Sequence, residues 1–335
     1  MPNSFGGYDM REEILRILYE SAERYISGER ISQMLGISRA AVWKHIQALQ
    51  REGFVIEAVT HKGYRLTGAD DVLHAALIGP MLTTRDLGRN IVCMPCVPST
   101  NAAARALAAE GCAGGTVLTA DSQTEGRGRR GRSWSNAPGK DIAMSIVLRP
   151  RLEPEFASRY TFATALGVYR LAEGLGLAPS IKWPNDVLLD GKKFCGILFE
   201  VAGEMDALHT VIAGIGLNVN SESFPEEIRE IATSLRICLG RPLQRRHVIA
   251  ALLNILEPLY DACADEAGYE ALLRAYLSHC GTIGQRVTVT GIRETLGGTA
   301  EGVDELGRLL LRTDDGALHA LLAGDVTLRG GARLT

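Results

Sequence analysis

Residues 126–132 read Gly-Arg-Gly-Arg-Arg-Gly-Arg and bring four guanidinium groups and three glycines into one short segment. Glycine removes side-chain bulk, so backbone N–H groups can approach a ligand, and guanidinium groups are planar, permanently charged donors that suit phosphate or carboxylate. The segment therefore predicts a loop that holds a small anion. A solvated basic loop and an arginine-rich RNA-binding segment are the alternatives that this segment alone leaves open.

A second segment whose side chains could take part in chemistry is Lys-Trp-Pro-Asn-Asp at residues 182–186. It is followed by an Asp-Gly pair typical of a two-residue hairpin turn. The strand expected to return from this turn begins with Lys192 and Lys193, and by strand alternation one of them points inward. An inward lysine near an arginine-rich loop needs an anion between them. Asp186 could hold a metal or orient that lysine, and an ordinary surface ion pair is the competing interpretation.

Two further segments place polar side chains where strands are expected to end. Ser99, Thr100 and Asn101 follow a proline at the start of an alanine-rich helical run, where they either cap the helix or face a ligand. Residues 213–220 read Ala-Gly-Ile-Gly-Leu-Asn-Val-Asn, and these small side chains and amides suit the flat edge of a base. A Gly-x-Gly pair alone is a weak signal for a nucleotide site.

The N-terminal part of the chain has the pattern of a separate module. Apolar residues recur at helical spacing between residues 10 and 19, and a second short helix is expected to end at Gly36. Ser38 is expected to cap a third helix with an apolar stripe that runs from Val42 to Leu49. A basic hairpin follows at residues 54–65, so the pattern predicts a winged helix-turn-helix.

Positive charge is concentrated in the second half of this module. Residues 1–36 carry four basic and six acidic side chains, whereas residues 37–66 carry five basic and two acidic ones. This distribution favours DNA binding, although winged helices also serve as protein-interaction modules. The candidate contacts are Ser38 and Lys62 for the DNA backbone and Arg39, Lys44 and Gln47 for base edges. One such domain holds a half-site weakly, so specific binding requires a dimer.

The composition indicates a soluble globular protein of two or three domains. The chain has 335 residues, of which 46% are apolar and 22% charged, and a net charge of −3 that excludes a protein coating nucleic acid. We find no signal-peptide pattern and no apolar run that could span a bilayer, which predicts a cytoplasmic protein without a membrane partner. The seven cysteines lie in apolar surroundings typical of reduced thiols, and Cys93 with Cys96 lacks the second pair of a zinc site.

Taken in order along the chain, these segments resemble the biotin protein ligase family. The resemblance rests on Ser-Thr-Asn at 99–101, Gln123 with the glycine-arginine loop and Trp134, Lys-Trp-Pro-Asn-Asp at 182–186, Lys193 with Gly-Ile-Leu at 196–198, and residues 214–218. With the N-terminal module, the chain is similar to the bifunctional bacterial biotin ligases that also repress the biotin operon. The resemblance covers nearly the whole chain.

The resemblance implies an α+β, multidomain fold. We expect a winged helix-turn-helix DNA-binding domain at residues 1–66, a linker at 67–82, a biotin- and ATP-binding catalytic domain with a mixed α/β sheet at 83–280, and a small SH3-like β-barrel at 281–335. Short alternating strands with glycine turns support the last of these domains independently.

The same resemblance implies a two-step reaction. The carboxylate of biotin attacks the α-phosphorus of ATP to give biotinyl-5′-adenylate and pyrophosphate, and a lysine of a biotin carboxyl carrier domain then attacks the mixed anhydride. Two anions must meet before the first bond forms, so cationic side chains carry most of the catalysis. ATP and Mg²⁺ are expected with biotin as the substrate, and no tightly bound prosthetic group is expected.

Site residues follow from the resemblance at the matching positions. The catalytic candidates are Lys193, Arg127, Arg129 and Asp186, of which Asp186 is also the candidate Mg²⁺ ligand and an aid to deprotonation of the acceptor lysine. The biotin-binding candidates are Ser99, Thr100, Asn101, Gln123, Gly126, Arg127, Gly128, Arg129, Lys193 and Gly196. The ATP-binding candidates are Arg129, Arg130, Arg132, Trp134, Lys182, Gly214, Gly216 and Asn218.

The adenylate is expected to link the two activities. A charged, glycine-rich loop should be mobile when empty, and its ordering around the adenylate would complete a homodimer surface that brings two winged helices onto palindromic operator DNA. The alternatives are a non-catalytic biotin-sensing repressor and a lipoate ligase-like enzyme. The intact arginine loop with Lys193 argues against the first, and the N-terminal module with residues 183–186 disfavours the second.

Overall fold

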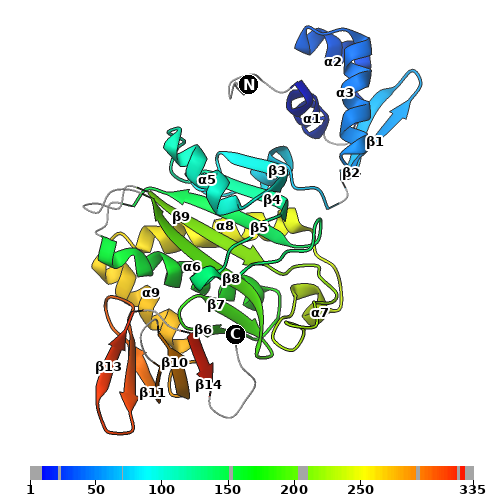
Figure 1. Ribbon diagram of the computed structural model, residues 1–335. Coiled ribbons are helices and arrows are strands. Elements are labelled where there is room, and N and C mark those ends of the chain that lie inside the picture. Colours follow the sequence, from blue (N-terminus) through cyan, green and yellow to red (C-terminus); the bar gives the residue numbers. More distant parts are fainter. Residues whose placement is uncertain are drawn as a thin grey trace. The chain divides into compact units, whose positions relative to one another are not determined.

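The computed structural model describes residues 10–21, 24–69, 71–150, 154–202, 210–291, 295–322 and 325–328. It consists of two compact units, Met1–Pro80 and Met81–Thr335. The first unit is drawn in blue in Figure 1, and the second continues through green to red. No helix of the described ranges combines the length and the apolar surface needed to cross a membrane.

The first unit is a helical module followed by a β-hairpin (Figure 1). Its elements are α1 (Met10–Glu20), α2 (Gly28–Leu35), α3 (Arg39–Arg51), β1 (Phe54–Val59), β2 (Gly63–Ala69) and α4 (Ala75–Ile78). The side chains of Ser27 and Ser38 cap α2 and α3 by accepting backbone N–H hydrogen bonds. Gly36 ends α2 with a φ of 66°, which permits the tight turn into α3. The predicted winged helix-turn-helix is confirmed.

The apolar stripes of the helices form the core of this unit. Ile14 and Leu18 of α1 and Val42, Ile46 and Leu49 of α3 are at most 1% exposed and belong to one cluster. Burial of each such side chain contributes about 1.5–3 kcal/mol, so packing holds this module together more than helix propensity does.

The second unit is built on a seven-stranded mixed sheet of order β3-β4-β5-β9-β8-β7-β6. The strands are β3 (Ile91–Val97), β4 (Val117–Gln123), β5 (Ile142–Leu148), β6 (Pro179–Lys182), β7 (Asp186–Leu189), β8 (Lys192–Ala202) and β9 (Thr210–Leu217). Only β3 and β4 pair in parallel. The expected hairpin turn joins β7 to β8, with positive φ at both Asp190 and Gly191, as in a type I′ turn.

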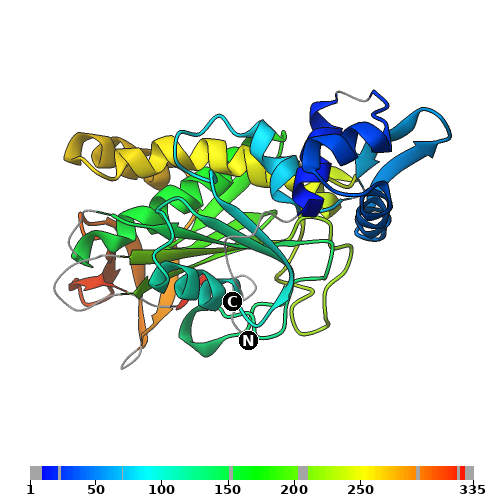
Figure 2. The same ribbon diagram turned by 90° about the horizontal axis from the view of Figure 1, so that it is seen from above.

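Five α-helices of the described residues belong to the second unit, and two of them, α5 (Thr100–Ala109) and α6 (Ser158–Gly174), pack directly against this sheet. The others are α7 (Leu235–Leu239), α8 (Arg245–Ala262) and α9 (Glu266–Ser278). Helix α5 contacts β4, β5 and β9, whereas α6 contacts β6, β7 and β8 and is itself packed against α8 and α9. Figure 2 shows the long helix α8, in yellow, beside α6. Every residue of β5 is buried, which explains its nearly continuous apolar sequence.

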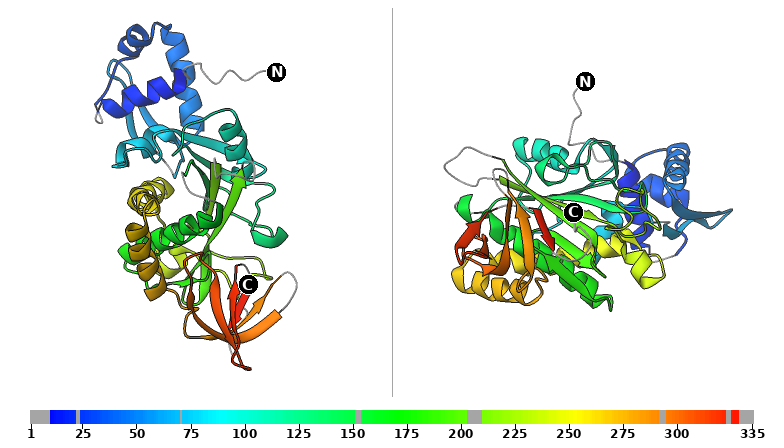
Figure 3. Two further views of the ribbon diagram at one scale, coloured as in Figure 1. Left: turned by 90° about the vertical axis from the view of Figure 1, so that its left-hand side faces the viewer. Right: turned by 60° about the horizontal axis from the view of Figure 1, so that its bottom comes forward.

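The C-terminal part of the second unit is a five-stranded antiparallel sheet of order β13-β12-β11-β10-β14, orange and red in Figure 3. Its strands are β10 (Arg286–Thr290), β11 (Thr295–Val303), β12 (Leu309–Thr313), β13 (Leu318–Leu321) and β14 (Asp325–Leu328). The predicted small antiparallel domain is confirmed. Its closure into a barrel is not seen, because β13 and β14 are the two edges of the described sheet.

Two hydrogen bonds link the connection between β11 and β12 to the rest of the unit. The indole N–H of Trp183 donates to the carbonyl oxygen of Gly307 at 3.2 Å, and the hydroxyl of Ser158 donates to that of Leu306 at 3.0 Å. The first contact ties the C-terminal sheet to residues 182–186, which include the predicted catalytic residue Asp186 and the predicted ATP-binding residue Lys182.

A carboxylate of α8 fastens the segment that leads into β3. Glu257 accepts hydrogen bonds from the backbone N–H groups of Arg85, Asp86 and Leu87 at 2.6, 2.8 and 2.7 Å. Partial burial opposes ionisation, but the three amide donors outweigh it and hold the pKa of Glu257 below its usual value. Because the folded-state pKa is depressed, this stabilisation is full above the unfolded pKa of about 4.3 and is lost as the pH falls through the folded value.

We predict that Glu257→Gln lowers the free energy of unfolding by about 2 kcal/mol at pH 7, since charge-assisted amide hydrogen bonds are lost. Urea denaturation at a series of pH values measures this, and the difference from wild type should shrink below about pH 4. The control is Glu270→Gln on α9, whose ion pair with Arg274 is exposed and spans 3.5 Å, with an expected change below about 0.5 kcal/mol. A difference that does not vary with pH would exclude the charge of Glu257 as its source.

Candidate functional site

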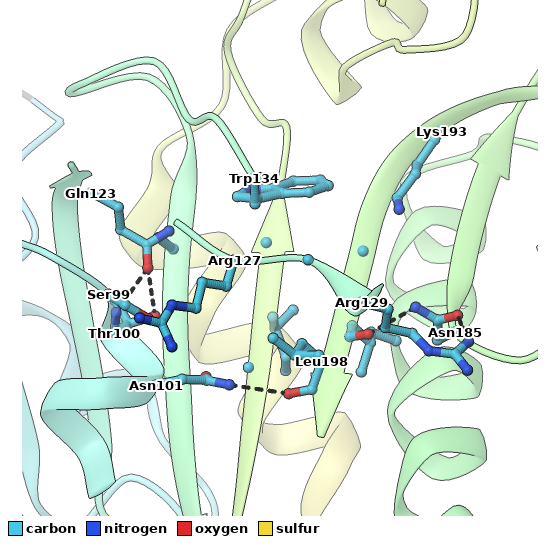
Figure 4. Close-up of a pocket in the computed structure, with 17 residues that line it drawn as sticks. Ser99, Thr100, Asn101, Gln123, Arg127, Arg129, Trp134, Asn185, Lys193 and Leu198 are labelled. Atoms are coloured by element: carbon cyan, nitrogen blue, oxygen red, sulfur yellow. Dashed lines mark hydrogen bonds between the residues drawn. The ribbon is translucent and has the colours of Figure 1, made fainter. Parts of the chain in front are cut away.

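A cavity opens in the second unit beside the glycine-arginine loop, over β5, β8 and β9 (Figure 4). It is lined by Ser99, Thr100, Asn101, Gln123, Arg127, Gly128, Arg129, Trp134, Ala143, Asn185, Lys193, Gly196, Ile197, Leu198, Gly214, Ile215 and Gly216. All the residues predicted to bind biotin except Gly126 are among them. Segments far apart in the sequence are therefore brought together around one space.

One end of the cavity carries neutral hydrogen-bonding groups. The side-chain oxygen of Gln123 accepts from the backbone N–H of Thr100 at 2.8 Å and from its hydroxyl at 3.0 Å. These bonds fix the orientation of the Gln123 amide, as the dashed lines in Figure 4 show. Ser99 begins α5 without a side-chain cap hydrogen bond, so its hydroxyl is available to a ligand. The structure therefore does not show Ser99 capping α5 through its side chain.

Asn101 is held by side chains that lie behind the cavity. Its carbonyl oxygen accepts from the hydroxyl of Ser145 at 2.6 Å, and its amide donates to Glu200 at 2.7 Å and to the carbonyl oxygen of Leu198 at 3.3 Å. Arg105 pairs in turn with Glu200 at 3.0 Å. Donor and acceptor are both engaged, so the amide of Asn101 can take one orientation only.

Trp134 lies across two strands because both have glycine beneath it (Figure 4). A Cβ at Gly216 would lie 2.3 Å from the indole ring, and one at Gly196 would lie 2.9 Å from it. The indole N–H has no hydrogen-bond partner among the described residues, although the nitrogen is buried. A buried N–H donor without a partner is available to a ligand.

The glycine-arginine loop closes on itself through its backbone. The N–H of Trp134 donates to Gly126 at 2.8 Å, and the N–H of Gly128 donates to Arg132 at 2.7 Å. Gly126 permits this, because a Cβ there would lie 2.2 Å from the carbonyl oxygen of Trp134. The loop thereby presents Arg127 toward Ser99 and Thr100, as Figure 4 shows.

Two arginines of the loop reach other segments. The guanidinium of Arg129 donates to the side-chain oxygen of Asn185 at 2.7 Å, and the amide of Asn185 donates to the carbonyl oxygen of Ile197 at 2.8 Å. Arg130 has a positive φ of 57° and donates to the carbonyl oxygen of Thr290, at the end of β10, at 2.6 Å. Asn185 thus holds Arg129 at the cavity, whereas Arg130 contacts the C-terminal sheet.

Lys193 is the inward lysine that strand alternation requires. Its ammonium group is 2.7 Å from a carboxylate oxygen of Asp186 and lies over the ring of Trp134, 5.4 Å from the ring centre. The next residue but one, Cys195, is fully buried, and burial raises the pKa of its thiol. Lys193 therefore projects a partly buried positive charge into the cavity while the cysteine stays a neutral packing group.

A second cavity adjoins the first and shares Gly128, Arg129, Trp134, Asn185 and Lys193 with it. It is also lined by Arg132, Ser133, Ser135, Lys182, Trp183, Pro184, Asp186, Asn218, Phe224, Ile228, Ile231, Ala232 and Val326. Lys182 and Asn218 are buried, and the amide of Asn218 donates to the carbonyl oxygen of Thr233 at 3.0 Å. This cavity combines cationic and amide groups with an apolar wall.

Several predicted residues lie elsewhere than expected. Gly214 and Gly216 line the first cavity and not the second, because Gly214 lies against Asn101 and Gly216 against Trp134. Arg130 lines neither cavity, since it extends to Thr290. Their assignment to ATP therefore receives no support from these positions.

Sequence reasoning missed the residues behind the cavity. Ser145 had a signal, because it is the single polar residue in the apolar strand β5, and a buried hydroxyl needs a partner. Glu200 had no such signal, since its neighbours in the sequence do not distinguish it from an exposed strand residue. The apolar wall of the second cavity, which includes Phe224 and Ile228, also lacked a local signal.

In the first unit the five predicted DNA contacts lie on α3 and the hairpin. Arg39 and Lys44 are exposed on α3, and Lys62 lies at the tip of the hairpin, 5.7 Å from the ring centre of Tyr25. The hydroxyl oxygen of Ser38 caps α3, which leaves its O–H proton free to donate. Gln47 is half-buried and donates to Gln50 at 2.9 Å.

Three family models match the chain, and together they cover most of it. The model of the HTH domain matches residues 11–65, that of the Biotin/lipoate A/B protein ligase family matches residues 93–218, and that of the Biotin protein ligase C terminal domain matches residues 282–329.

Curated and solved relatives agree with these matches. The chain is 37% identical to the Bifunctional ligase/repressor BirA of Bacillus spizizenii over 95% of this chain and 98% of that protein. It is 35% identical to the Biotin--[acetyl-CoA-carboxylase] ligase of Paracoccus denitrificans over 64% of this chain and 90% of that protein. The biotin protein ligase of Aquifex aeolicus, solved with biotin and ATP, has a TM-score of 0.62 and 28% identity over 72% of this chain and 99% of its own.

We predict that Ser145→Ala weakens binding of biotin, the ligand implied by the sequence resemblance, about tenfold. The substitution leaves the buried carbonyl oxygen of Asn101 without a donor and frees the amide to rotate. Titration calorimetry with biotin measures the effect. The matched control is Thr119→Val, which removes another fully buried hydroxyl from the same sheet, one that bonds only the carbonyl oxygen of Ala143. Equal losses in both variants would mean that the effect is one of general stability.

Proposed function

This chain belongs to the family of bifunctional biotin protein ligases and biotin repressors, and on that premise we propose that it attaches biotin to a lysine of a carrier domain and represses transcription. The ligation consumes ATP and releases AMP and pyrophosphate. One observation carries the proposal: the two cavities meet at Arg129 and Lys193, the cations that a carboxylate and a phosphate need when they approach each other.

The first cavity suits biotin. Its polar end, with Ser99, Thr100 and Gln123, offers donors and acceptors to a ureido group, which has two N–H donors and one carbonyl acceptor. Its glycine and aliphatic surfaces suit an apolar ring and chain. Arg127 closes over the polar end, and the carboxylate of the ligand would then reach Lys193.

The second cavity suits ATP. Phe224, Ile228 and Ile231 provide an apolar surface for adenine, and the buried Lys182 provides a charge for the phosphates. Arg132 lies at the same cavity and adds a second cation. Because the two cavities share lining residues, a nucleotide bound in the second would have its α-phosphorus beside the first.

In the first step a carboxylate oxygen of biotin forms a bond to the α-phosphorus, and the bond from that phosphorus to the bridging oxygen of pyrophosphate breaks. Lys193 and Arg129 offset the repulsion between the carboxylate and the phosphate and stabilise the negative charge that develops on the phosphoryl oxygens. Asp186 holds the ammonium group of Lys193 at the junction of the cavities before the anions arrive.

In the second step the amine of a carrier lysine attacks the carbonyl carbon of the adenylate, an amide bond forms and AMP leaves. The attacking amine must lose a proton, and Asp186 is the carboxylate at the cavity that can accept it. No residue of the chain needs to form a covalent intermediate.

This site fits Mg²⁺ only if the phosphates of the nucleotide supply most of the ligands of the ion. The described residues contain no group of three His, Cys, Asp or Glu side chains that could hold a metal. Asp186 is the single carboxylate in the lining of the second cavity, and Mg²⁺ is commonly held by one carboxylate, water and substrate phosphates. When bound, the ion would neutralise charge on the phosphates that leave.

The partners follow from the same proposal. The acceptor is the biotin carboxyl carrier domain of a biotin-dependent carboxylase, and the repressor function requires operator DNA. Two copies of the chain, joined in the presence of biotinyl-5′-adenylate, would place two winged helices on a palindromic site. Ligation and repression both belong in the cytoplasm.

We predict that Lys193→Gln reduces carrier biotinylation at least 100-fold, because the charge at the junction of the cavities is replaced by a neutral, shorter polar group. The rate of pyrophosphate release measures the first step. The matched control is Lys192→Gln, the preceding residue, which is half-exposed and lines neither cavity. Equal rates for wild type and Lys193→Gln would remove the proposed electrostatic role.

The ligase proposal is tested by incubating the chain with ATP, Mg²⁺, biotin and a carrier domain, followed by intact-mass analysis of the carrier. We expect the carrier to gain the mass of one biotinyl group and to remain unmodified when ATP or biotin is omitted. A carrier that stays unmodified here but reacts with a known ligase would end the proposal. Biotin binding without transfer would leave a non-catalytic biotin-sensing repressor.

A further inference from the structure

The outward side of α3 carries a large aromatic side chain, Trp43. Trp43 is 57% exposed, whereas the other side of the same helix buries Val42 and Ile46 completely. Tryptophan is usually largely buried because of its apolar area, so this exposure has a cost that packing inside the unit does not offset.

Trp43 lies within the row of candidate DNA contacts. It is the fifth residue of α3, one helical turn after Arg39 and one turn before Gln47, and residues four apart share a helix face. In helix-turn-helix proteins the N-terminal part of the second helix of the motif approaches base edges. The position of Trp43 is therefore one that reaches into the major groove.

The charges around Trp43 favour a polyanion as the partner. Lys44 and Lys62 make no ion pair with a carboxylate in the described part of the chain, and Arg39 has only a distant one, 3.7 Å from Glu29. The two acidic side chains of residues 37–66, Glu52 and Glu57, are both paired with arginines within this unit. Positive charge is thus left available on the helix that carries the exposed ring and at the tip of the hairpin.

Only one apolar group projects into the major groove of B-DNA, the C5-methyl group of thymine. An indole ring cannot replace Arg or Gln as a hydrogen-bonding reader, but it can cover a methyl group and exclude water from it. We propose that Trp43 is a specificity-determining residue that recognises thymine methyl groups in each half-site of the DNA. The proposal rests on the repressor function and adds a sequence preference to it.

The test uses the full-length chain with biotin and ATP and a DNA duplex selected by the wild-type chain from a random-sequence pool. Each thymine of the selected site is replaced in turn by deoxyuridine, which removes only the methyl group, and binding is followed by fluorescence anisotropy. For wild type, affinity should fall about fourfold at one or two thymines per half-site, as expected for loss of one buried methyl group. Trp43→Ala should bind the unmodified site about tenfold more weakly and should no longer distinguish thymine from deoxyuridine at those positions.

Two controls separate base recognition from other effects. Trp43→Ala should leave the salt dependence of binding unchanged, whereas Lys62→Ala should reduce its slope by about one counterion, because only the lysine contacts phosphate. Met34→Ala removes another apolar side chain, 55% exposed on α2, and should bind the DNA like wild type. Carrier biotinylation should be equal in wild type, Trp43→Ala and Met34→Ala, which shows that the catalytic unit is folded, and equal thermal unfolding of the three chains should show the same for the first unit.

The outcomes distinguish this proposal from the function it rests on. Selection of no DNA by the wild-type chain would end the repressor function and this inference with it. DNA binding by Trp43→Ala equal to that of wild type, or a deoxyuridine effect that persists in the variant, would overturn only the inference and assign this face to a protein partner. An equal loss on specific and random DNA would also overturn it, because Trp43 would then contact the DNA backbone.

Discussion

The ion pair between Lys193 and Asp186 is the interaction around which the catalytic unit is organised. A lysine that is only partly exposed needs a nearby negative charge, and Asp186 supplies it at 2.7 Å. The two residues come from β8 and β7, which are joined by a turn of two residues, so the pair is fixed by local hairpin geometry. Lys193 lines both cavities, so under the proposed function the surrounding segments have to bring the biotin carboxylate and the nucleotide phosphate to this charge.

The rest of the unit meets that requirement through rigid attachments. Trp134 rests on the glycines of β8 and β9, Asn185 holds Arg129, and Trp183 is tied to the C-terminal sheet at Gly307. Each attachment joins segments that are distant in the sequence. The sheet order therefore matters for function as well as for stability, because it decides which strand ends lie side by side.

Local chemistry could be predicted from the sequence, whereas partners across the fold could not. Alternation predicted that one of Lys192 and Lys193 points inward, the resemblance selected Lys193, and helical spacing with Ser38 as a cap predicted the winged helix. The hydrogen bond from Asn101 to Glu200 could not be predicted, because it depends on the three-dimensional proximity of α5 and β8. The same limitation applies to Gly214, because the sequence did not show that its small size makes room for the amide of Asn101. Closure of the C-terminal domain was inferred from family resemblance, and the described strands have two edges instead.

The contact between Trp134 and Gly216 has a consequence for how such sequences can diverge. Any amino acid other than glycine at position 216 would place its Cβ 2.3 Å from the indole. A substitution at this position therefore requires a change at Trp134 as well. A lineage that gained a side chain there would first have to replace the tryptophan with a smaller residue. The two positions should consequently change together over evolutionary time, and their joint substitution would mark members of the group in which this part of the pocket has been rebuilt for another ligand.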